Sequence, residues 1–175
     1  MDLPNPHVAL FASPGSHLIP LVALSKCLFS LHGFHSTIFV ASAPTTTFLS
    51  KVESLNLPSA IRIVHLSPPN ISTFVTRQTA VVSCIHIIVR ESIPALRAAI
   101  ADMSRQPTVL VVEMFGTSAF TVAEELDIPK YLYIPMTAAY LALMVSVPTL
   151  HKEIKGEYVD MQEPLCIPGC KPIRA

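Results

Sequence analysis

The stretch HVALFASPGSHLIP, residues 7–20, decides the fold, because an apolar run leads through a Pro-Gly turn into a helix-like segment. This order of elements begins the repeating unit of an open α/β sheet, which binds ligands at the carboxyl ends of its strands. The turn delivers His17 to that edge, where an imidazole can titrate near neutral pH. A second buried-type strand, 109–112, runs into Glu113. We therefore expect a base and a carboxylate at two strand ends.

Strand-like and helix-like runs alternate along the chain, which is typical of βαβ units and a parallel sheet. We expect strands over residues 7–13, 36–40, 61–65, 109–112 and 130–134. We expect helices over residues 18–31 (ended by Gly33), 45–55, 76–103 (bent near Pro94), 117–126 and 137–147 (closed by Pro148). The predicted fold is α/β, a Rossmann-like parallel sheet flanked by helices.

The composition sets limits on partners and location. The 175 residues include 12 basic and 12 acidic ones, so charge gives no reason to expect nucleic acid or an anionic membrane as a partner. The chain is 51% hydrophobic and 14% charged, which suits a parallel sheet buried on both faces. No run is long enough to span a membrane, and the first residues lack the pattern of a signal peptide. We expect a cytoplasmic protein.

Metal binding is not indicated. The four cysteines do not form a secreted-type framework, and Cys166 and Cys170 flank a turn without a second ligand pair for zinc. The histidines other than His17 lack the spacing of metal ligands. We expect a site without metal.

Two motifs carry a family resemblance. SPGSHLIP, residues 13–20, resembles the Ser-Pro-Gly-x-Gly-His-Leu-Ile-Pro loop of plant UDP-dependent glycosyltransferases of family 1. VVEMFGT, residues 111–117, resembles their Val-Val-Asp-x-Phe-Gly-Thr segment. The similarity continues at residues 68–72, 90–97, 122–126 and 167–170, and it points to enzymes of the hydroquinone and anthocyanidin 3-O-glucosyltransferase type.

The resemblance implies the N-terminal, acceptor-binding half of a two-domain GT-B enzyme. Such an enzyme would transfer glucose from UDP-glucose, with inversion, to a phenolic or flavonoid-type hydroxyl, and it would need no cofactor or metal. The residues that the resemblance implicates are His17 as the base, Glu113 as the carboxylate that orients it, Ser13 and Thr137 facing the donor sugar and phosphates, and Met114 and Phe115 in the acceptor wall.

The sequence departs from the family at the catalytic pair. Glu113 replaces an Asp, and its extra methylene displaces the carboxylate by about 1.5 Å, while a 1 Å error can cost roughly 10²-fold in rate. The loop before His17 is one residue shorter than in the family, and Ser16 stands where the family has a second glycine. A serine would resist the backbone angles that a glycine permits there. The softer candidates also have structural interpretations: Ser13 as a turn hydroxyl, Thr137 as an N-cap, Met114 and Phe115 as core.

Residues 1–149 are predicted to form the acceptor-binding domain, incomplete, and 150–175 a proline-rich tail, cut short. The chain has no tryptophan, so the family's tryptophan-containing nucleotide-sugar domain is predicted to be absent. We expect the chain alone to be inactive and to self-associate through its interdomain face. The alternative function is a non-catalytic small-molecule binding or interaction module from a truncated gene. An unrelated Rossmann-type enzyme is disfavoured, since the first turn lacks Gly-x-Gly-x-x-Gly.

Overall fold

The computed structural model describes residues 6–41, 56–156 and 158–174. The chain forms two compact units, residues 1–133 and 134–175. The first unit holds the sheet and the second holds a helix and the proline-rich tail. The predicted division of the chain after residue 149 stays a prediction.

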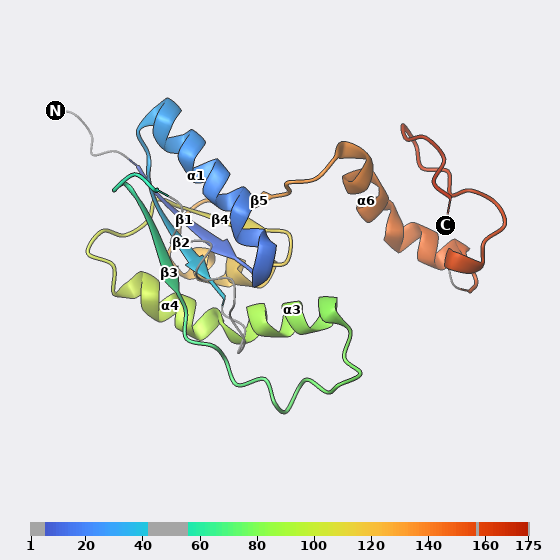
Figure 1. Cartoon of the computed structure of the whole chain (residues 1–175), viewed down its shortest axis with the longest axis horizontal. Helices are drawn as coiled ribbons and strands as arrows, with labels where there is room; N and C mark the ends of the chain where they lie inside the picture. The colour runs from blue at the N-terminus through green and yellow to red at the C-terminus, as the bar shows by residue number, and fades with distance from the viewer. Residues whose placement is uncertain (1–5, 42–55, 157, 175) are drawn as a thin grey trace. The chain divides into compact units, whose positions relative to one another are not determined.

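The first unit is built on a parallel five-stranded sheet with the order β3-β2-β1-β4-β5, as Figure 1 shows. The strands are β1 (His7–Ala12), β2 (His35–Val40), β3 (Ile61–His65), β4 (Val109–Glu113) and β5 (Lys130–Tyr133). Strand order reverses between β1 and β4, and open α/β sheets bind ligands beyond the carboxyl ends of strands at such a switch point. The predicted strands and the parallel sheet are confirmed.

Helices cover both faces of this sheet (Figure 1). The helical elements of the first unit are η1 (Gly15–His17), α1 (Leu18–His32), α3 (Val81–Glu91), α4 (Ile93–Ala101), η2 (Thr117–Ala119) and α5 (Phe120–Glu125). Helix α1 packs on the face that carries Val8 and Leu10, while α3, α4 and α5 pack on the face that carries Ala9 and Phe11. Because alternate residues of β1 point to opposite faces, a continuous apolar run is what a strand buried on both sides requires.

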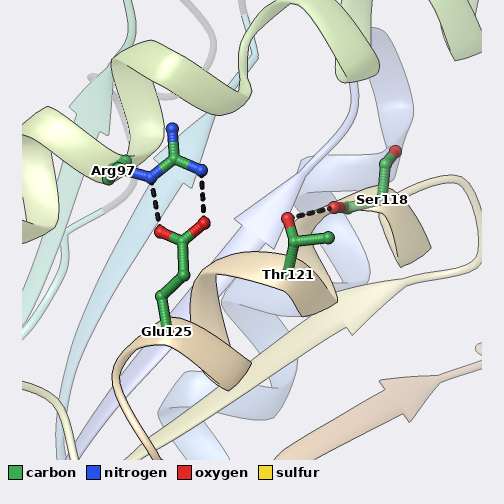
Figure 2. A network of polar contacts seen from close by, with 4 residues as sticks. All are labelled: Arg97, Ser118, Thr121 and Glu125. Carbon is green, nitrogen blue, oxygen red and sulfur yellow. Dashed lines mark hydrogen bonds and ion pairs between the residues drawn. The ribbon is translucent and has the colours of Figure 1, made fainter.

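An ion pair joins two of the helices on one face. Figure 2 shows Arg97 of α4 donating to both carboxylate oxygens of Glu125 of α5, at 2.5 and 2.7 Å. In the same view, the Thr121 hydroxyl donates to the Ser118 carbonyl at 3.0 Å. Since both charged side chains are exposed, the pair contributes little to the stability of the fold.

Two predicted helices differ from the structure. The predicted helix over 76–103 is two helices, and the break lies at Ser92, where the buried hydroxyl donates to the Ile88 carbonyl at 2.7 Å. Pro94 lies in the first turn of α4, where a missing N–H costs no helical hydrogen bond. The prediction that Pro148 closes a helix is wrong, since α6 (Ala138–Glu153) continues through it. A proline removes one helical hydrogen bond and does not always end the helix.

The second unit contains α6, the short η3 (Tyr158–Asp160) and a tail closed on itself by paired backbone hydrogen bonds between Leu165 and Ile173. The predicted helix over 45–55 lies outside the described residues. Within the described ranges, no helix combines the length and the apolar character that crossing a membrane requires.

Candidate functional site

His17 reaches the switch-point edge through a short turn after β1. Gly15 adopts φ +85°, a left-handed conformation that favours glycine, and η1 then leads directly into α1. Ser16 does not need such a conformation, because Asp127 is the non-glycine residue with positive φ in the described part of the chain. The expectation that Ser16 strains the shortened loop is therefore wrong: Gly15 alone makes the turn.

Glu113 meets His17 from the neighbouring strand. It is the last residue of β4, and Val112 pairs with Phe11 of β1, so the two strand ends lie side by side. The carboxylate is almost completely buried, with 1% of the side chain exposed, and its Oε2 lies 3.4 Å from Nδ1 of His17. The structure thus brings together the two residues that the sequence singled out as base and carboxylate.

The contact between them is looser than a good hydrogen bond. A separation of 3.4 Å exceeds the usual 2.7–3.2 Å for N–H···O. The same oxygen, Oε2, also accepts the backbone N–H of Phe115 at 3.1 Å, and Oε1 is buried with no hydrogen-bond partner among the described residues. Catalytic hydrogen bonds are often long before substrate binds and shorten afterwards. The geometry therefore suits a pair whose hydrogen bond shortens when substrate binds.

Phe115 contacts the imidazole, and Gly116 closes the turn that follows Glu113. The Phe115 ring lies edge-on to His17, with centroids 5.1 Å apart and an interplanar angle of 85°. The Gly116 N–H donates to the Glu113 carbonyl at 2.8 Å, closing a tight turn. A Cβ on Gly116 would lie only 2.9 Å from Cβ of Val112, so the turn requires glycine there. The sequence alone did not single out Gly116, although this residue lies within the VVEMFGT motif of residues 111–117.

The other predicted residues are less engaged. Ser13 follows β1 and is fully buried, and its hydroxyl has no hydrogen-bond partner among the described residues. Met114 is half-buried next to Glu113. Thr137 belongs to the second unit, where its hydroxyl accepts the Tyr140 N–H at 3.2 Å and caps α6. The helix-capping interpretation of Thr137 is thus observed, while contacts of these three residues with substrate stay predictions.

No grouping of three histidine, cysteine or acidic side chains suited to a metal ion occurs within residues 6–41, 56–156 and 158–174. The four cysteines are free thiols. The side chains that meet at the switch point are an imidazole, a buried carboxylate and an aromatic ring.

No family model matches the chain, whereas curated proteins and solved structures do. The chain is similar to anthocyanidin 3-O-glucosyltransferase 5 of Manihot esculenta, at 41% identity over 172 residues, covering 97% of the chain and 35% of the relative. It is 35% identical over 175 residues to hydroquinone glucosyltransferase of Rauvolfia serpentina, covering 97% of the chain and 36% of the relative.

A solved structure gives the same result. Phytolacca americana UGT2, complexed with UDP-2fluoro-glucose and pterostilbene, superimposes with a TM-score of 0.86 at 32% identity, covering 99% of this chain and 40% of that one. The fold is that of the N-terminal Rossmann-like domain of GT-B glycosyltransferases, as predicted. The chain corresponds to an amino-terminal part of the plant UDP-glycosyltransferases, which confirms the predicted resemblance. It spans about a third of the length of the curated relatives it matches.

Proposed function

We propose that this chain is the acceptor-binding part of a UDP-glucosyltransferase that transfers glucose from UDP-glucose to a phenolic or flavonoid-type hydroxyl. The observation that carries the proposal is the contact between His17 and the buried carboxylate of Glu113 at the switch point of the sheet. The relatives include glucosyltransferases named for anthocyanidin and hydroquinone, and these names support this substrate class.

The geometry suggests how the proton moves. Nδ1 of His17 faces Glu113, so this nitrogen carries the proton and Nε2 is left to accept one. The acceptor oxygen attacks the anomeric carbon of glucose while the bond from that carbon to UDP breaks, UDP leaves with the electron pair, and Nε2 takes the hydroxyl proton. One displacement without an enzymic nucleophile inverts the anomeric carbon. Glu113 stabilises the imidazolium that results.

An aromatic acceptor would be held beside this base. The half-buried Phe115 ring stands next to the imidazole, and Met114 follows Glu113 at the same strand end. Pockets for small molecules are lined mainly by apolar and aromatic side chains, with a few polar groups that fix orientation. We infer that the acceptor ring packs against Phe115 with its hydroxyl toward Nε2 of His17.

The test is a chimera in which residues 1–175 replace the matching part of the Manihot esculenta relative, which supplies the remaining length. With UDP-glucose and hydroquinone, the chimera should form a glucoside, and the coupling constant of its anomeric proton should show inversion. His17→Ala should lower the rate by about 10²–10⁴-fold, the usual range for a general base. His65→Ala, which removes an exposed histidine at another carboxyl strand end, is the matched control. Equal activity of the two variants would contradict the proposal.

The second candidate is a non-catalytic binding module. The long 3.4 Å contact and the Glu in place of Asp favour it. It predicts that the chimera binds hydroquinone but releases no UDP, and that Glu113→Asp restores turnover. A chimera active without that change would exclude this candidate.

A further inference from the structure

Strand β5 lies at the edge of the sheet but has the side chains of an interior strand. In the order of the described strands it comes last, paired with β4. Tyr131 is 61% exposed and Leu132 is 43% exposed. Tyr131 lies opposite Val111 on the sheet face that α1 covers, and Leu132 lies opposite Val112 on the other face. The open edge therefore carries a large apolar side chain on each face, where strands of parallel sheets are normally buried.

The backbone of β5 offers hydrogen-bonding groups along the same edge. The Leu110 N–H of β4 donates to the Pro129 carbonyl at 2.9 Å, so the Pro129 carbonyl points toward β4. Backbone groups alternate in direction along a strand, so Tyr131 also turns its groups toward β4, and Leu132 turns its N–H and carbonyl outward. An edge strand with outward N–H and carbonyl groups is a template for pairing with another chain.

The opposite edge of the sheet, β3, differs in its exposed side chains. Within residues 61–65 the exposed side chains are those of Arg62 and His65, and charged or polar side chains discourage pairing at an edge. Strand β5 has a single charged residue, Lys130, and its ammonium group is paired with Glu124 of α5. Of the two edges, β5 is therefore the one suited to pairing.

We propose that β5 pairs antiparallel with β5 of a second copy of this chain, about a twofold axis through Leu132. Directly opposed residues of antiparallel strands point to the same face, so two identical strands related by an axis normal to the sheet must pair about a residue. Leu132 has its N–H and carbonyl outward, so it exchanges both hydrogen bonds with Leu132 of the second copy. Tyr131 then lies opposite Tyr133 of the second copy.

This register is compatible with the side chains of both copies. Tyr131 and Tyr133 lie on the same sheet face, and opposed aromatic side chains stabilise a strand pair. The two copies of Lys130 lie about 14 Å apart along the strands, at about 3.4 Å per residue. That separation exceeds the Debye length of about 10 Å at 0.1 M salt, so the pairing opposes no like charges closely. The interface does not depend on the proposed transferase activity.

The experiment is sedimentation of the 175-residue chain over a range of concentrations, where a monomer–dimer equilibrium is expected. Leu132→Lys should weaken the dimer by about tenfold or more, because it places two ammonium groups directly opposite each other. Leu31→Lys is the matched control, because Leu31 is an exposed leucine of α1, outside the sheet. It should dimerise like the unchanged chain, and circular dichroism should show that both variants keep their secondary structure.

Amide hydrogen exchange gives a second measurement that needs no variant. Exchange of the Leu132 N–H should slow as the concentration of the unchanged chain rises, because pairing protects this group. The proposal is overturned if the unchanged chain is monomeric at every concentration, or if the two lysine variants dimerise equally well. Association that leaves the exchange of the Leu132 N–H unchanged would also overturn it, since the chain would then associate through another surface.

Discussion

Replacing Glu113 by Gln tests whether its charge assists His17. The amide keeps the size of the side chain and an oxygen that can accept the Phe115 N–H, so the turn at β4 is expected to survive. What is lost is the negative charge 3.4 Å from Nδ1. Only the imidazolium that forms in the transition state feels that loss strongly.

The magnitude follows from the distance. Coulomb's law gives about 5 kcal/mol for unit charges 3.4 Å apart at an effective dielectric constant of about 20. The His17 side chain is 26% exposed, so water screens part of this interaction, and about half, 2–3 kcal/mol, is a reasonable remainder. Each 1.36 kcal/mol is tenfold in rate, so Glu113→Gln should lower kcat by about 10²-fold.

The assay is UDP release by the chimera under saturating UDP-glucose and hydroquinone. Glu124→Gln is the control, because Glu124 is an exposed carboxylate of α5 paired with Lys130 and far less buried than Glu113. It should leave kcat unchanged. A Glu113→Gln variant that folds and turns over as fast as the unchanged chimera would refute the role given to the carboxylate.

Three further outcomes are expected. Gly116→Ala should destabilise the chain by about 1–3 kcal/mol in urea unfolding, because its Cβ meets that of Val112, whereas Thr117→Ala at the exposed next position should change stability by less than about 0.5 kcal/mol. His7→Gln should remove a pH dependence: burial holds the folded pKa of His7 below the ordinary 6.5, so the unfolded chain takes up the proton first. The free energy of unfolding of the unchanged chain should therefore fall relative to that of the variant as pH falls through 6.5, and the loss should level off below the folded pKa. Parallel curves of unfolding free energy against pH for the two proteins would contradict this. The 175-residue chain alone should release no UDP and should scatter light as an associated species, and a monodisperse, active monomer would contradict both expectations.

The sequence predicted the sheet and the meeting of His17 with Glu113 for the same physical reason. Apolar runs mark strands buried on both faces, and parallel strands end at one edge, so residues that follow neighbouring strands converge. Gly33 was also predictable, since its left-handed conformation, with φ 67°, ends α1 as a glycine often does.

Other features depended on contacts that no local pattern reveals. The sequence predicted a bend near Pro94, and the break lies two residues earlier at Ser92, whose hydroxyl donates to the Ile88 carbonyl. Helix α6 passes Pro148 because one lost hydrogen bond is not enough to end it. The 3.4 Å contact depends on how far the Glu113 side chain extends.

The central claim is that His17 removes the proton of the acceptor. The direct measurement is the ratio of the transfer rate of the unchanged chimera to that of His17→Ala, across phenols of graded acidity. A general base matters less as the acceptor gives up its proton more readily, so the ratio should fall steadily and approach one for a phenol already ionised at the assay pH. A ratio that stays constant across the series would show that His17 supports the structure of the site and does not take the proton.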